Sequence, residues 1–292
     1  MKYLIINADD FGMSHEANRA ILELLKTGKI SSTSLMANGI YYDEAVQMIR
    51  ENDLQDIGIH LAVTRDGFDA ENPLLYRSLT HAKTLEDENG NLYQDINQIK
   101  AHVKYSELVQ ECEEQYKKIL KDNINFTHID NHMYTVVPGL RLKGYVAVVK
   151  AYQRVNDRSV RGIRFARKVK PIDNLFEIWT GRKITPIIKI LLKCTKLKFV
   201  DYVYSFPFNA TKVPNLEDKK KCFENFLANI EEGITELHIH PSIYSDEIHL
   251  FNPTWQHRVQ EYQLFKEIDL EQTLNKYGVT LKTYGELCEK SN

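Results

Sequence analysis

The sequence predicts an α/β protein in which helices cover a parallel β-sheet. Short apolar runs that indicate buried strands alternate along the chain with longer amphipathic segments, and such alternation is typical of parallel sheets. The composition fits one globular unit with a sizeable core, since 43% of the 292 residues are hydrophobic, 27% are charged and the net charge is −2.

The first half of the chain gives the clearest alternation. KYLIINA (2–8) predicts a buried strand, and the next segment predicts a helix that Ser14 caps and Gly28 ends. The order then continues with a strand in 30–37, a helix in 42–52, a strand in 56–63, a long polar loop over 66–95 and one long helix or a pair of helices over 96–120. This half therefore predicts three parallel strands and their crossover helices.

The second half continues the same order with weaker signals. Strands are expected within 125–134, 161–167, 234–243 and 279–287, and helices within 142–154, 252–265 and 269–278. Between Arg141 and Lys198 the chain has 16 Lys and Arg residues against three acidic ones. That stretch predicts a solvated helical surface or an inserted segment, and the alternative is a patch that attracts an anionic ligand.

Several functional classes are disfavoured. Near-neutral charge argues against a dedicated nucleic-acid binder, and the four scattered cysteines have no metal-binding or disulfide spacing. No apolar run reaches 18 residues and the N-terminus turns acidic too early for a signal peptide. We therefore expect a cytoplasmic protein without membrane or nucleic-acid partners; the sequence does not indicate its oligomeric state.

Polar residues occupy the ends of four expected strands, where a core cannot use them. They are Asp9 and Asp10; His60; His128, Asp130 and His132; and His238 and His240. The carboxyl ends of parallel strands converge on one face, especially in a closed or nearly closed barrel. Carboxylates and imidazoles from separate strands suit a divalent metal ion with open positions for water.

Each of these residues has a simpler structural interpretation. Asp9 or Asp10 could cap the following helix, and a single buried histidine such as His60 is commonly a hydrogen-bonded core residue. We expect only one of His238 and His240 to face the site and favour His240, which precedes Pro241. If a cation neutralises Asp10, then Asp9 could stay charged beside it and accept a proton from bound water.

Four segments in this order resemble the YdjC-like carbohydrate deacetylase family: NADDFG (7–12), GIHL (58–61), THIDNH (127–132) and ELHIHP (236–241). The resemblance extends from Tyr3 to about Tyr262. It implies a distorted (β/α) barrel of the polysaccharide-deacetylase type, as a single domain over 1–292 with the basic segment at about 165–200 as an insertion. It also implies removal of acetyl groups from N-acetylated sugars such as chitooligosaccharides.

The resemblance assigns roles to the matching residues. Asp10, His60 and His132 correspond to the family's metal ligands, Asp9 to the catalytic base, and His240 to the general acid. The implied cofactor is a divalent ion, Mg²⁺ or Zn²⁺, and the implied partner is a small carbohydrate substrate. The runner-up is another metal-dependent barrel enzyme, an isomerase or lyase acting on a sugar, and a third class is a sugar-binding protein with a decayed site.

Three further residues are expected around the site. Asp130 is expected to orient His132 or His128, and His128 to lie behind the ligands or contact substrate. Arg164 is expected to pair with Asp9 or bind a sugar hydroxyl, unless it is a surface arginine. The chain departs from the family pattern at Asn131 and Met133–Tyr134, which leaves the identity of the substrate open.

Overall fold

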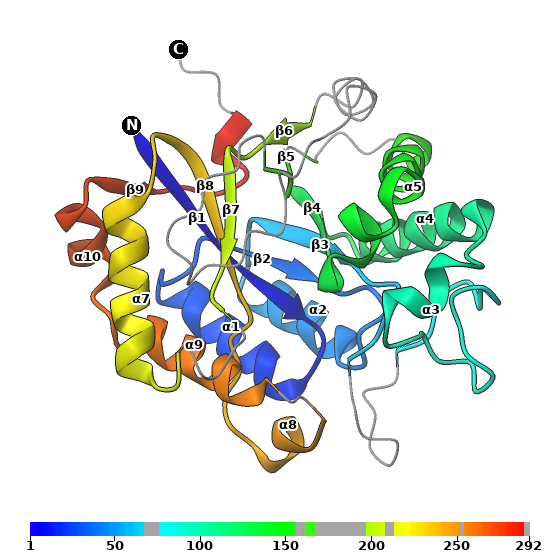
Figure 1. Cartoon of the computed structure of the whole chain (residues 1–292), viewed down its shortest axis with the longest axis horizontal. Helices are drawn as coiled ribbons and strands as arrows, with labels where there is room; N and C mark the ends of the chain where they lie inside the picture. The colour runs from blue at the N-terminus through cyan, green and yellow to red at the C-terminus, as the bar shows by residue number, and fades with distance from the viewer. Residues whose placement is uncertain are drawn as a thin grey trace.

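The computed structural model describes residues 1–66, 76–155, 160, 162–166, 197–207, 213–251 and 254–288. The strands in these residues form one nine-stranded sheet of the order β6-β5-β4-β3-β2-β1-β8-β7, and β9 pairs with β1 (Figure 1). Every pairing between them is parallel. The α/β class with a parallel sheet is therefore confirmed.

The expected elements are present, but the strands at 198–199 and 202–205 and the helices at 216–229 and 246–251 were not expected from the sequence. The strands are β1 (Lys2–Phe11), β2 (Ser32–Leu35), β3 (Ile57–Leu61), β4 (His128–Asn131), β5 (Gly162–Ile163), β6 (Lys198–Phe199), β7 (Tyr202–Ser205), β8 (Gly233–Ile239) and β9 (Val279–Leu281). The helices are α1 (His15–Lys26), α2 (Tyr42–Glu51), α3 (Ile96–Lys100), α4 (Tyr105–Lys121), α5 (Arg141–Val155), α7 (Leu216–Asn229), α8 (Asp246–Phe251), α9 (Trp255–Glu267) and α10 (Leu270–Lys276). Short non-α turns lie at His132–Tyr134, Thr135–Gly139 and Glu286–Cys288.

The two ends of the sheet meet at one segment of chain. β6 pairs with β5, β7 pairs with β8, and only Val200 and Asp201 separate β6 from β7. Three Cα–Cα steps span at most about 11 Å, whereas the edges of a flat eight-stranded sheet would lie about 34 Å apart at the usual strand spacing. The sheet is therefore curled into a barrel-like form, in agreement with the distorted barrel that the family resemblance implies.

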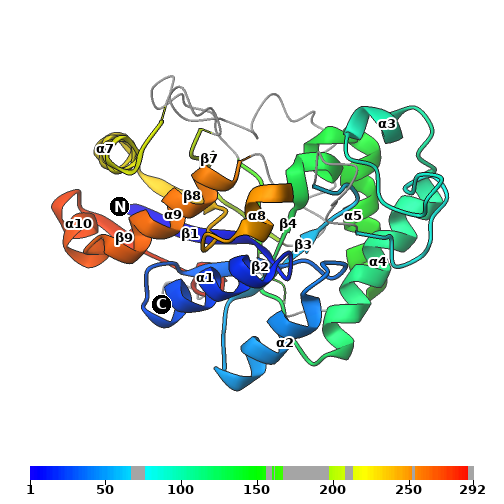
Figure 2. The same cartoon turned by 90° about the horizontal axis from the view of Figure 1, so that it is seen from below.

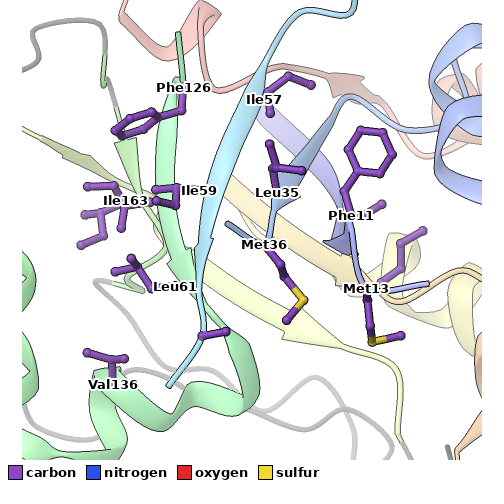
Figure 3. Close-up of a cluster of buried hydrophobic side chains, with 14 of the residues drawn as sticks. Phe11, Met13, Leu35, Met36, Ile57, Ile59, Leu61, Phe126, Val136 and Ile163 are labelled. Atoms are coloured by element: carbon purple, nitrogen blue, oxygen red, sulfur yellow. The ribbon is translucent and has the colours of Figure 1, made fainter. Parts of the chain in front are cut away.

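Apolar residues fill both sides of this curled sheet. Leu4, Ile6 and Ala8 of β1 belong to the large core between the sheet and the helices. Figure 3 shows part of this core, with labelled side chains from β1, β2, β3, β5 and segments beside the strands. Ile5 faces the other way and packs with Val203 and other residues in a smaller cluster, which also includes Ala166, Val200 and Tyr284. Because neighbouring strand residues alternate in direction, this smaller cluster lies inside the barrel.

Helices surround the outside of the sheet, as the second view shows (Figure 2). α1 begins at the predicted cap, since the Ser14 hydroxyl accepts a hydrogen bond from the Ala17 amide at 3.1 Å. The segment expected as one helix or a pair forms two helices, α3 and α4. Most of the basic segment at about 165–200 lies outside the described residues. Among the described residues, no helix is both long and apolar enough to cross a membrane.

Candidate functional site

A backbone irregularity at the end of β1 turns two adjacent carboxylates toward one place. The register between β1 and β2 shifts between Ala8 and Phe11, and Asp10 has a φ of 69°. Adjacent residues of a regular strand face opposite ways, but a bulge re-aims a side chain. Asp9 and Asp10 are both buried, and neither caps α1, so the pair belongs to the site rather than to the helix terminus.

The three expected metal ligands come together around Asp10. The Asp10 Oδ1 atom lies 3.3 Å from His60 Nε2 and 3.1 Å from His132 Nδ1. One candidate ligand atom from each of the three buried residues lies within 4.8 Å of the other two. Asp10 lies on β1, His60 on β3, and His132 directly after β4, so the three residues come from three parts of the sheet far apart in the chain.

Each imidazole of this trio faces a second carboxylate. His60 Nδ1 lies 2.7 Å from Asp130 Oδ1, and His132 Nε2 lies 2.9 Å from Asp66 Oδ2. Burial alone would lower the pKa of His60, but Asp130 and Asp9 outweigh it and raise that pKa to about 10. In the same way Asp66 and Asp10 outweigh burial and raise the pKa of His132 to about 9. Without a bound cation, both rings therefore attract protons.

Arg164 is buried at the centre of the carboxylates rather than on the surface. Its two terminal nitrogens lie 2.6 Å from the two oxygens of Asp9, in a bidentate pair. It also pairs with Asp130 at 2.8 Å and with Glu236 at 2.7 Å. Burial would raise the pKa of Asp9, but Arg164 and His60 hold it below its usual range. Asp9 is therefore ionised and fixed in direction.

The late strand β8 and helix α9 complete the site. His240 Nε2 lies 3.8 Å from Asp9 Oδ2, and Arg258 Nη1 lies 2.7 Å from Asp10 Oδ2. The rings of His238 and His240 are 5.6 Å apart, and both can reach Asp9. Residues two apart in a strand share a face, so the expectation that only one of the two histidines faces the site is wrong.

His128 is packed beneath the site. It has no exposed surface, stacks on the Tyr284 ring at 4.0 Å between centroids, and its Nε2 lies 3.1 Å from Asn7 Oδ1. Burial lowers the pKa of His128 to about 4, so the ring is neutral. Asn7 in turn donates to Asp9 at 2.9 Å. Of the two interpretations of His128, this burial favours a place behind the ligands.

Asp130 contacts one of its two expected partners only at a distance, since His128 Nε2 lies 4.0 Å from Asp130 Oδ2. Its close imidazole partner is His60, because β3 and β4 are neighbours and His60 pairs in register with Asp130. The expected pairing of Arg164 with Asp9 is confirmed.

Asp66, Glu236 and Arg258 were missed as site residues. Glu236 shares a face of β8 with His238 and could have been found from that period of two. Asp66 and Arg258 reach the site only through tertiary structure, which no local pattern reveals.

Comparisons with known proteins identify the family of the chain. The family described as YdjC-like protein matches residues 3–276. A carbohydrate deacetylase of Thermoanaerobacter pseudethanolicus is 28% identical over 286 residues, which cover 97% of this chain and 98% of that protein. Carbohydrate deacetylase 1 of Listeria innocua is 36% identical over 132 residues, 44% of this chain and 50% of that one.

A solved structure has the same fold along its whole length. It is a protein of Enterococcus faecalis V583 proposed to cleave cellobiose phosphate, with a TM-score of 0.74, 19% identity and 98% of each chain covered. The family match includes all four motifs and extends past the expected end near Tyr262. The chain therefore belongs to the YdjC-like protein family.

Proposed function

We propose that this protein is a divalent-metal-dependent hydrolase that removes an acetyl group from an N-acetylated sugar. The observation that carries the proposal is the pairing of the trio Asp10, His60 and His132 with Asp9 and His240 at the same strand ends. A cation bound by the trio would lie next to the carboxylate of Asp9, which Arg164 fixes in direction, and near the imidazole of His240. The naming of relatives as carbohydrate deacetylases supports the reaction class.

The charges around the trio fit a dication. Four buried or nearly buried aspartates gather here with two buried guanidinium groups, Arg164 and Arg258. The same excess of carboxylates raises the pKa values of His60 and His132. A divalent ion brings the same charge as two protons, and imidazole nitrogens with a carboxylate oxygen are ligands that Zn²⁺ accepts.

Asp10, His60 and His132 would hold the ion. When bound there, a divalent ion polarises a carbonyl group and lowers the pKa of water from about 15.7 toward about 7. Two imidazoles favour Zn²⁺, whereas the surrounding carboxylates also suit Mg²⁺.

Asp9 and His240 would then divide the proton transfers. Asp9, held by Arg164, takes a proton from water at Oδ2 as the water oxygen adds to the acetyl carbon. Burial lowers the pKa of His240, so its imidazolium is a stronger acid than a free one; protonated at Nε2, it gives its proton to the amine nitrogen as the carbon–nitrogen bond breaks. The products are acetate and the free amino sugar. General acid–base catalysis of this kind contributes roughly 10² to 10⁴ in rate.

Acetate release from N,N′-diacetylchitobiose tests the proposal. The protein is stripped of metal and assayed alone and after addition of Mg²⁺, Zn²⁺ or Co²⁺, with His132→Ala as the matched variant. Metal-dependent release that disappears in His132→Ala supports both the reaction and the ligand set. One bound ion per chain without acetate release from this or other N-acetylated sugars would overturn the deacetylase proposal and favour an isomerase or lyase with the same ligands.

A further inference from the structure

A buried ion pair lies directly behind His240. Lys219 of α7 has no exposed surface, and its Nζ lies 3.3 Å from Glu261 Oε1 of α9. The same ammonium donates to the His257 carbonyl at 3.2 Å. Lysine is almost never fully buried without a partner, and a buried ion pair is weak grounds for stability because both charges lose their hydration. The position of the Lys219–Glu261 pair beside His240 is therefore more informative than its contribution to stability.

The second oxygen of Glu261 holds the main chain of the candidate general acid. The His240 amide donates to Glu261 Oε2 at 2.6 Å. This amide lies beyond both ladders of β8, since the pairing with β1 ends at Ile239 and the pairing with β7 ends at His238. A buried amide needs an acceptor. Glu261 supplies the acceptor that the neighbouring strands do not provide beyond the end of β8.

One helix thereby reaches both halves of the site. Arg258, one turn before Glu261 on α9, binds Asp10 through its side chain, and its carbonyl accepts from the Ser242 amide at 3.2 Å. The ends of β1 and β8 are thus both tied to α9, and Lys219 ties α9 to α7.

We infer that Glu261, neutralised by Lys219, is a positioning residue that fixes the backbone of His240 for proton transfer. This inference rests on the proposed function, because it assigns a purpose to the placement of His240. Removal of the acceptor frees the segment after β8, whereas removal of Lys219 alone leaves a buried negative charge beside His240. The titratable and charged groups facing His240 are Asp9 and Asp10 from β1, His238 from β8, and Arg258 and Glu261 from α9.

Four variants of the full, metal-loaded protein test the inference. They are Glu261→Ala, Lys219→Met, the double variant Lys219→Met/Glu261→Gln, and Lys220→Met as the control. Lys220 pairs with Glu267 at 2.9 Å between the same two helices, but both side chains are exposed. The readouts are kcat and KM per folded protein, bound metal, and the pKa of the His240 ring by NMR.

Glu261→Ala is expected to lower kcat about tenfold or more with KM and bound metal unchanged. The double variant keeps an oxygen acceptor without a buried charge and is expected to stay within about threefold of the original kcat. Lys219→Met is expected to raise the pKa of His240 by about half a unit or more, because an uncompensated carboxylate favours imidazolium. The double variant returns that pKa to its original value, and Lys220→Met changes nothing.

Two results would overturn the inference. One is a His240 pKa that is the same in Lys219→Met as in the original protein; the other is a double variant as inactive as Glu261→Ala. If Glu261→Ala does not fold, the pKa of His240 in Lys219→Met and in the double variant still tests the inference. If the original protein releases no acetate, the proposed function fails, and the NMR comparison still tests the placement of His240.

Discussion

Asp130 Oδ1 lies 2.7 Å from His60 Nδ1, and this contact leaves His60 Nε2 facing Asp10. The two residues are paired in register on adjacent strands, so the backbone itself sets the contact. Outer carboxylates of this kind fix the direction of a ligating imidazole.

Replacement of Asp130 by Ala is expected to weaken metal binding about 10- to 100-fold, because His60 loses the group that orients it. Metal affinity can be measured by competition with a chelating dye. Asp122→Ala is the control, since Asp122 bonds Tyr42 and Arg50 away from the site. An affinity unchanged by Asp130→Ala would contradict the assigned role.

Asp9→Asn is expected to lower kcat about 10²- to 10⁴-fold while the metal content stays at the original level. The amide keeps the shape of the carboxylate but accepts no proton, and Asp10 still holds the ion. Acetate release and elemental analysis of the same sample separate the two effects. Near-original turnover would rule out Asp9 as the base.

Arg164→Leu is expected to destabilise the fold by about 3–5 kcal/mol, because it leaves the carboxylates of Asp9, Asp130 and Glu236 without their shared cation. Urea unfolding of metal-free protein gives the difference in free energy. Arg154→Leu is the matched control: its pair with Glu113 is exposed on the arginine side and is expected to contribute about 1 kcal/mol or less. Equal losses in both variants would contradict the buried network.

Metal binding is expected to release protons. In the metal-free protein the pKa of His60 is raised to about 10 and that of His132 to about 9, so both rings are protonated at pH 7. A ligating imidazole must be neutral, so a cation displaces these protons and its apparent affinity rises with pH, by up to tenfold per unit for each proton. The rise should level off above the two raised pKa values.

Calorimetry in buffers of different ionisation enthalpy measures this release. At pH 7 the expected value is about two protons per ion. A value near zero would mean that the rings are already neutral before the ion binds.

The alternation of strands and helices, and the strand ends that carry the site, followed from the sequence because each depends on local patterns. The trio of Asp10, His60 and His132 followed from resemblance rather than from spacing. Its members lie far apart in the chain, and only the parallel sheet brings them together.

Other features depended on tertiary structure. The bulge that turns Asp10 beside Asp9 has no local signature beyond the acidic pair itself, since positive φ values are uncommon for residues other than glycine, even though aspartate adopts them more often than most. Arg258 and Glu261 look like ordinary helix-surface residues until α9 packs against the strand ends. Arg164 could be a surface or a buried residue because β5 has only two residues.

The pairing of β1 has a consequence for folding during synthesis. β1 ends at Phe11, yet its partner β8 begins at Gly233 and its partner β9 at Val279. At about 5–20 residues per second, the ribosome needs roughly 10–45 s to make the chain between the end of β1 and the start of β8. One edge of β1 therefore waits unpaired for that time, and pairings of such long sequence separation also form slowly. The strand that carries Asp9 and Asp10 is made early and completed late, so the candidate site is assembled only after β8 has been made.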